Sequence, residues 1–265
     1  METGDGEVGQ EGQPSRAWES RSRLLPLDGA FNLRDIGGLR AGSRKVKEGL
    51  LFRADALDQL SVGDQRRVAA LGIRTVIDLR TPSELPDADR LASIDALHRV
   101  QAPLSYRTWD ESKIGVGTAA SDYIADRYIE IAVESGPAVG SVLSVLADRR
   151  ALPAVVHCGL GKDRTGLLIA ITLSLVGVDD ESIAVDYSLT GQGLERMRVV
   201  ATSSEDPGLL MRLNQPPAFL SAPAAAIVGF LQGIRDQFGS IEGFAATTGV
   251  SRAQVDAVRS HLLDS

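Results

Sequence analysis

The sequence predicts an α/β fold in which a central mixed or parallel β-sheet is flanked by helices, with extra helices at the C-terminal end. Apolar, β-branched segments at residues 73–79 and 154–156 are typical of buried strands. Segments with helical apolar spacing alternate with them. Residues 167–176 form an apolar stretch that is too long for a strand, so we expect a buried helix that stops at Gly177.

Local signals place the other elements of the N-terminal half. Residues 24–53 combine short apolar runs with glycines, which indicates irregular structure and short strands. Ser61 has the side chain of an N-cap for an amphipathic helix that ends at Gly72. Prolines interrupt the pattern at residues 82–86, and residues 97–103 form a further candidate strand.

Helical patterns dominate the C-terminal half. The acidic residues 179–181 favour the start of a helix, because they complement the positive end of the helix dipole. Residues 201–217 are polar and contain prolines, which predicts a mobile connector. Apolar spacing predicts further helices at residues 122–133, 137–148, 222–239, 241–248 and 251–263.

Composition bounds the classes of protein that fit. With 265 residues, of which 43% are hydrophobic, the chain can form one domain with extensions, which we assign to residues 21–265. Residues 1–20 are rich in Gly, Glu and Gln and predict a disordered tail. Neither a signal peptide nor an apolar run of about 18 residues is evident, so we expect a cytoplasmic protein with at most peripheral membrane contact. Export without a signal peptide stays open.

Charge and cysteine content narrow the function further. The net charge of −7 leaves no overall basic face for nucleic acid. A single cysteine rules out an internal disulfide, and the three histidines lie far apart in sequence, so neither a metal site nor a cofactor is expected. The oligomeric state cannot be predicted from these features.

The most informative motif joins Cys158 to Arg164, six positions later, between the strand at 154–156 and the helix at 167–176. The first amides of a helix lack intrahelical partners, and the helix dipole adds about half a positive charge there, so the turn predicts an anion site. Gly159 and Gly161 allow successive amides to converge on one point. The planar guanidinium of Arg164 matches two oxygens of a phosphate.

A thiol at this position is expected to ionise readily, because helix N-termini and nearby cations lower the cysteine pKa from its usual value of about 8.5. Thr165 is expected to donate a hydrogen bond to the sulfur. The motif therefore predicts a phosphatase in which Cys158 attacks phosphorus and water hydrolyses the resulting cysteinyl-phosphate. His157 is expected to point to the opposite face from Cys158 and to orient the loop, or else to be an ordinary core histidine.

The segment His157-Cys158-Gly159-Leu160-Gly161-Lys162-Asp163-Arg164-Thr165 resembles the HCxxGKDR loop of the atypical bacterial tyrosine and dual-specificity phosphatases of the protein tyrosine phosphatase B type. Further segments that resemble this family begin at Phe31, Leu51, Val76 and Asp186. The resemblance implies a tyrosine-phosphatase-like sheet, no metal, and phosphotyrosine, phosphoserine, phosphothreonine or phosphoinositide substrates.

The resemblance also implies individual roles. Cys158 is the nucleophile and Arg164 the phosphate clamp, while Gly159, Leu160 and Gly161 contribute to substrate binding. Lys162 would add positive charge at the mouth of the site, which suits a phosphorylated inositol headgroup. A polar cluster of Asn32, Arg34 and Asp35 would brace the loop from behind, or else form a tight glycine turn with Asx hydrogen bonds.

Three aspartates compete for the role of general acid, which protonates the leaving oxygen and later activates water. Asp163 lies inside the loop and is favoured by the resemblance. Asp78 follows an apolar strand, at the sheet edge where ligand sites form in open α/β folds, although it could simply pair with Arg80 or Arg34. Asp110 follows Trp109 in a polar loop.

Two functions from other classes stay open on sequence alone. A rhodanese-type sulfurtransferase also uses a loop cysteine, although Arg164 fits phosphate better. A catalytically silent phospho-binding module would need the same loop without turnover.

Overall fold

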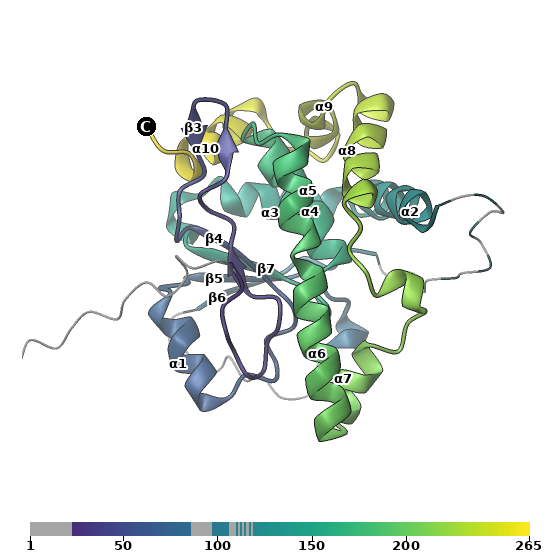
Figure 1. The fold of residues 1–265 in the computed structure, drawn as a ribbon. Coiled ribbons are helices and arrows are strands. Elements are labelled where there is room, and N and C mark those ends of the chain that lie inside the picture. Colours follow the sequence, from purple (N-terminus) through teal and green to yellow (C-terminus); the bar gives the residue numbers. More distant parts are fainter. Residues whose placement is uncertain are drawn as a thin grey trace, which may run out of the picture.

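The computed structural model describes residues 23–85, 97–105, 110, 112, 114, 117 and 119–265. The predicted tail at residues 1–20 and Trp109 lie outside the described residues. Figure 1 shows a layered α/β arrangement in which helices lie on both sides of a central sheet. The predicted fold class is confirmed.

The sheet has the strand order β1-β4-β7-β5-β6, and β4, β7, β5 and β6 are parallel whereas β1 pairs antiparallel with β4. Their bounds are Arg34–Asp35 (β1), Leu51–Ala54 (β4), Thr75–Asp78 (β5), His98–Gln101 (β6) and Ala154–His157 (β7). Because parallel strands share one carboxyl edge, the ends of β4, β5 and β7 bring three loops together there. A separate hairpin consists of β2 (Arg40–Ala41) and β3 (Arg44–Lys45).

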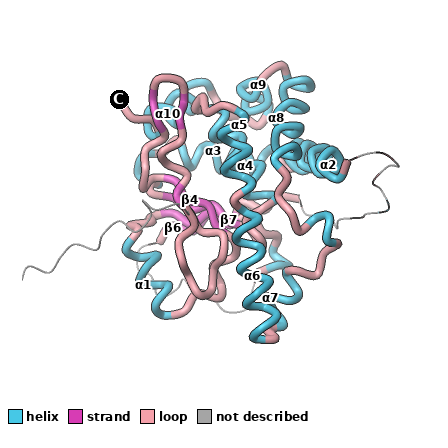
Figure 2. Tube along the Cα trace, in the orientation of Figure 1, coloured by secondary structure: helices cyan, strands magenta, loops and turns pink. Residues whose placement is uncertain are grey.

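The two faces of the sheet bury different sets of side chains, because successive strand residues point to opposite faces. Val155 of β7 packs with Phe52, Val76 and Val68 of α1 (Val62–Ala70) on one face. Val156 packs on the other face, within a larger core that also contains Ile77 of β5. Figure 2 shows α1 on one side of the magenta strands, with α2 (Ala120–Glu134), α3 (Gly136–Leu146), α4 (Asp163–Leu175) and α8 (Ala224–Phe238) on the other.

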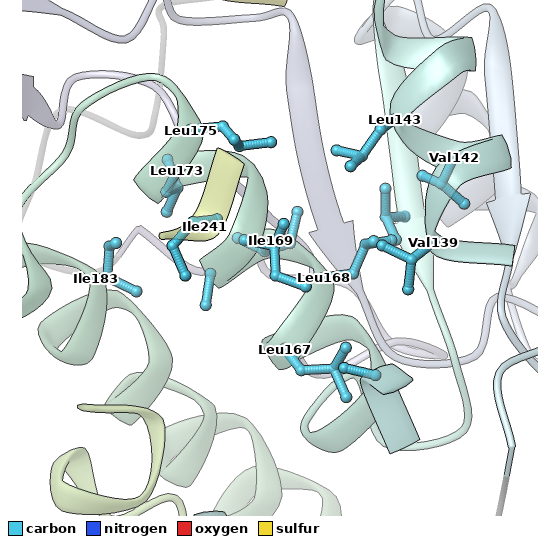
Figure 3. Close-up of a cluster of buried hydrophobic side chains, with 14 of the residues drawn as sticks. Val139, Val142, Leu143, Leu167, Leu168, Ile169, Leu173, Leu175, Ile183 and Ile241 are labelled. Carbon is cyan, nitrogen blue, oxygen red and sulfur yellow. The ribbon is translucent and has the colours of Figure 1, made fainter. Parts of the chain in front are cut away.

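The helix α4 (Asp163–Leu175) leads directly from the β7 turn into this larger core, and its predicted stop at Gly177 agrees with a φ of +92° there. Figure 3 shows Leu167, Leu168 and Ile169 of α4 among side chains from neighbouring helices. The helices around it are α2 (Ala120–Glu134), α3 (Gly136–Leu146), α5 (Asp180–Ser188), α8 (Ala224–Phe238), α9 (Ile241–Thr247) and α10 (Arg252–Leu262).

The prediction of a connector at residues 201–217 was wrong. The helix α6 (Thr190–Ser204) extends into this segment, and α7 (Pro207–Arg212) follows it. The side chain of Asp206 caps α7 by accepting from the Leu209 amide at 2.9 Å, and Pro207 occupies the first helical position. Prolines at helix starts favour helices, so this proline marked an element rather than a break.

Within the described part of the chain, no single helix is long and apolar enough to cross a membrane. The bent pair α2 and α3 meets the length and composition criteria only when both are taken together, at an angle of 78°.

Candidate active site

Cys158 lies at the carboxyl end of β7, in the turn that starts α4. The turn, residues 158–164, is called the Cys158 loop below. Cys158 is the free cysteine of the chain, 2% exposed, and lines a pocket of about 500 Å³. Gly159, Leu160, Asp163 and Arg164 line the same pocket. Of the predicted loop residues, Gly161, Lys162 and Thr165 are not among those that line this pocket.

Hydrogen bonds from behind fix the carbonyls of the loop. The Ala56 amide donates to the Gly159 carbonyl at 3.1 Å. Asn32 Nδ2 donates to the carbonyls of Leu160 and Gly161 at 3.1 and 3.0 Å, and Arg53 Nη2 also donates to Gly161 at 2.8 Å. The carbonyl and the following amide of a trans peptide point in opposite directions. The amides of residues 160, 161 and 162 therefore point away from these donors.

Glycine is required at position 161. Its φ is +65°, and a Cβ atom there would lie 2.4 Å from the Ala54 carbonyl oxygen. Only a residue without a side chain allows the loop to pack this closely against β4. Gly159 differs, because a Cβ there would meet only Arg164 Nη2, at 3.9 Å.

The bracing donors belong to a buried network around Asp186 of α5. Arg34 Nε donates to Asp186 Oδ1 at 3.1 Å, and Arg53 Nη1 donates to Oδ2 at 2.8 Å. Arg34 also donates to the side chain of Asn32, the residue that holds the loop. Burial raises the pKa of Asp186, but Arg34, Arg53 and Arg23 outweigh burial and hold it well below its ordinary value. Burial and the charge of Arg53 lower the pKa of Arg34 to about 10.

Asp35, the third predicted bracing residue, does not contact the loop in this structure. Its carboxylate accepts from the amides of Gly37 and Gly49 at 2.8 and 2.5 Å. It therefore closes the glycine turns that follow β1, as the alternative interpretation expected. Arg53 and Asp186 were missed as site residues, although both lie in segments that resemble the family.

Arg164 lies in the first turn of α4 and is held by a carboxylate that the sequence analysis overlooked. Its Nη1 and Nη2 donate to Glu84 Oε2 and Oε1, each at 2.7 Å. Burial alone would lower the pKa of Arg164, but its bonds to Glu84 raise it. Burial would likewise raise the pKa of Glu84, which Arg164 instead holds below its ordinary value.

Glu84 is itself fixed, because Oε2 accepts from the amide and hydroxyl of Thr81 at 2.9 and 2.8 Å. It ends the short 3₁₀ helix η2 (Pro82–Glu84), just beyond β5. The Thr-x-x-Glu spacing of a capping box was the available sequence signal, within a segment interpreted only as a break.

The three candidate acids occupy different environments. Asp163 lines the pocket beside Cys158, and its Oδ1 accepts from the Tyr128 hydroxyl at 2.6 Å. Asp78 receives bonds from Arg80 Nε and Nη2 at 3.1 and 2.8 Å and is not among the pocket-lining residues. Asp110 accepts from Ser112 and does not line the pocket either.

Asp78 pairs with Arg80, as the alternative interpretation of the sequence expected, and a catalytic role for Asp78 stays a prediction. Burial raises its pKa, but His157 and Arg80 outweigh burial and lower it. His157 Nε2 lies 3.7 Å from Asp78 Oδ2, and burial lowers the pKa of His157. One nitrogen of the His157 ring thus faces Asp78, and the ring also interacts with the Cys158 backbone.

Two other predictions differ from the structure. Lys162 was expected at the mouth of the site but is fully buried, where Nζ donates to the Phe219 carbonyl and lies 3.3 Å from Asp163 Oδ1. Gly161 has a positive φ, and the chain turn there directs the Lys162 side chain into the core. The charge of a lysine does not by itself indicate this inward direction. Thr165 was expected to donate to the sulfur, but its buried hydroxyl has no hydrogen-bond partner among the described residues.

Among the described residues, no group of three or more His, Cys, Asp or Glu side chains is arranged to hold a metal ion. The ionisable groups that line the pocket are instead the thiol of Cys158, three guanidinium groups and three carboxylates, from Arg80, Arg164, Arg212, Asp58, Glu84 and Asp163.

The chain is similar to known proteins that are named as phosphatases. The model of the tyrosine phosphatase family matches residues 25–264. Triple specificity protein phosphatase PtpB of Mycobacterium tuberculosis is 27% identical over 275 residues, covering 89% of this chain and 98% of PtpB. A tyrosine-protein phosphatase of Nostoc commune is 25% identical over 261 residues, covering 96% of this chain and 81% of its own. The structure of P. aeruginosa TpbA bound to pTyr covers 88% of this chain and 99% of its own, at 14% identity and a TM-score of 0.38.

The family match spans every residue that surrounds the pocket, and it favours a cysteine-dependent phosphatase over a sulfurtransferase. By the extent of that match, the chain belongs to the tyrosine phosphatase family.

Proposed function

We propose that this protein hydrolyses phosphate monoesters, phosphotyrosine among them, through a phosphorylated Cys158. The observation that carries the proposal is the direction of the loop peptides. Three successive carbonyls are held by donors behind the loop, so the amides of residues 160, 161 and 162 point away from those donors. Phosphoryl oxygens placed beside the sulfur would accept from these amides and from Arg164.

The reaction has two displacements at phosphorus. The Cys158 sulfur attacks in line, the bond from phosphorus to the leaving oxygen breaks, and the Asp163 carboxyl protonates that oxygen. Water then attacks the cysteinyl-phosphate, Asp163 takes its proton, and the S–P bond breaks to regenerate the thiolate and release inorganic phosphate. Asp163 is assigned this role because it is the candidate aspartate that lines the pocket.

Phosphotyrosine is the first substrate to test. Leu85, Leu160 and Met211 line the pocket, and Met211 is 75% exposed, so an aromatic ring would find apolar partners there. The relatives in M. tuberculosis and N. commune are named as triple specificity and tyrosine-protein phosphatases. Lys162 was the residue that favoured an inositol headgroup, but it is buried and cannot bind one at the mouth of the site. Phosphoinositides are therefore tested as alternative substrates in the same assay.

The test compares turnover of a phosphotyrosine peptide, a phosphoserine peptide and a phosphoinositide by the wild type, Cys158→Ser and Arg164→Lys. We expect Cys158→Ser to abolish turnover. Arg164→Lys should lower kcat/KM by about 10²-fold, because a hydrogen bond to a charged group contributes about 1.5–3 kcal/mol and lysine loses the bidentate geometry. Phosphate-ester hydrolysis that survives in Cys158→Ser would refute the proposal, as would a wild type that transfers sulfur from thiosulfate to cyanide but hydrolyses no phosphate ester.

A further inference from the structure

Two tyrosine hydroxyls lie in line behind Asp163, inside the core and outside the pocket. Tyr128 of α2 donates to Asp163 Oδ1 at 2.6 Å, and the Tyr187 hydroxyl of α5 lies 2.7 Å from the Tyr128 hydroxyl. Both tyrosines are at most 1% exposed. A Tyr hydroxyl can donate only one hydrogen bond. Because Tyr128 donates to Asp163, the Tyr128 oxygen must accept the hydrogen bond that Tyr187 donates.

Packing fixes both rings in these positions. The rings of Tyr128 and Tyr187 meet edge to face at 6.2 Å, and Phe230 of α8 packs against Tyr128 at 6.1 Å in the same manner. Gly166 of α4 makes room for Tyr187, because a Cβ atom there would lie 2.9 Å from the ring. Gly166, which follows Arg164 and Thr165 in the motif, therefore leaves the space that the Tyr187 ring occupies.

Both hydroxyls stay protonated throughout the pH range of interest. Burial and the nearby Asp163 carboxylate raise the pKa of Tyr128 and of Tyr187 well above their ordinary values. The hydroxyls therefore act as permanent donors and never as bases. A donor aimed at a carboxylate favours its ionised form.

We propose that Tyr128 and Tyr187 are positioning residues that fix the Asp163 carboxylate and set the pH at which it exchanges its proton. The proposal rests on the phosphatase function and on the role of Asp163 stated above. The bond to Oδ1 sets the rotation of the carboxylate, and among the described residues no donor contacts Oδ2. Oδ2 is then the oxygen that exchanges a proton with the leaving group and with water.

Other charged groups also face this carboxylate. Lys162 Nζ lies 3.3 Å from Oδ1, Arg164 follows Asp163 on α4, and Cys158 lines the same pocket. Arg53 acts on Tyr187 from the Asp186 network. None of these groups changes when a tyrosine is replaced by phenylalanine, so a shift in the titration reports the hydroxyl.

The test measures kcat/KM against pH with phenyl phosphate, whose poor leaving group needs an acid. The basic limb of the profile reports loss of the proton from the acid. In Tyr128→Phe, the limb should move to higher pH by about one unit, because a hydrogen bond to the charged carboxylate is lost. Tyr187→Phe should shift it less in the same direction, since the Tyr128 bond remains. Tyr123→Phe, on the same helix but with its ring against Phe219, should leave the limb unchanged.

A second readout does not depend on activity. A ¹³C titration of the Asp163 carboxyl, assigned with Asp163→Asn, should show a higher midpoint in Tyr128→Phe than in the wild type. If Tyr128→Phe does not fold, Tyr187→Phe carries both measurements. An unshifted limb and an unshifted carboxyl midpoint in a folded variant would overturn the proposal. If the wild type hydrolyses no phosphate ester but the Asp163 midpoint still differs between Tyr128→Phe and the wild type, the phosphatase function is rejected and the positioning role is kept.

Discussion

Replacing Asp186 by Asn tests how the fold holds the Cys158 loop. Asp186 is 1% exposed, and the side chains of Arg34 and Arg53 that bind it are 0% and 1% exposed. The amide would leave two buried guanidinium groups without the carboxylate that they share. Breaking a buried ion pair costs about 3–5 kcal/mol, which for a domain of this size lowers Tm by about 6–20 °C.

The assay is thermal and urea unfolding at neutral pH, with Asp180→Asn as the matched control. Asp180 binds Arg235 through two contacts of 2.6 Å, but both side chains are about 30% exposed. An exposed pair contributes about 0.2–1 kcal/mol, so the control should lose little. A change in unfolding free energy for Asp186→Asn that equals the control would refute the reasoning.

The same variant has a defined pH dependence. The pKa of Asp186 is lower in the folded chain than its ordinary value of 3.8, so its contribution is complete above that value and is lost as pH falls below it. The difference in stability between the wild type and Asp186→Asn should therefore shrink as pH falls below 3.8. A stability difference that stays constant as pH falls below 3.8 would show that the charge of Asp186 contributes nothing to that difference.

Three further predictions concern the pocket. Glu84→Gln should lower kcat/KM about 5–30-fold, because Arg164 loses the carboxylate that fixes its guanidinium. The ion pair is worth about 1–2 kcal/mol after allowance for the 27% exposure of the Glu84 side chain. A higher kcat/KM in this variant would mean that Glu84 instead competes with phosphate for Arg164. Gly161→Ala should abolish turnover, and also phosphate binding measured by calorimetry, because its Cβ atom would lie 2.4 Å from the Ala54 carbonyl oxygen. The control Gly42→Ala, at a φ of +63° but with no atom within 4 Å of the added Cβ, should keep turnover and phosphate binding. Asp163→Asn should flatten the basic limb of the pH profile while Asp78→Asn leaves it in place, and the reverse result would reassign the acid.

Local signals were sufficient for the centre of the site. Cys158, Arg164 and the two glycines lie within one short segment between a strand and a helix, so spacing alone placed them together. The strands β5 and β7 also followed from apolar, β-branched runs. The capping box of α1, formed by Ser61 and Asp64, matches the predicted N-cap.

Long-range contacts explain what sequence reasoning missed. Glu84 and Tyr128 lie 80 and 35 positions before the loop residues that they bind, and no local pattern links them. Lys162 shows the opposite error, because its charge suggested exposure while the turn at Gly161 directs it to the Phe219 carbonyl. Asp78 lies at a strand end as predicted, and its pairing with Arg80, two positions later, is one of the alternatives that the sequence left open.

The central claim is that phosphorus is transferred to the sulfur of Cys158. The most direct measurement is to quench the enzyme during turnover of para-nitrophenyl phosphate and to map the phosphate adduct by mass spectrometry. Cys158 is the only cysteine in the chain, so the adduct has one possible sulfur. We expect one phosphate on the Cys158 peptide of the wild type, and neither adduct nor turnover in Cys158→Ser. Full turnover by Cys158→Ser would contradict the account.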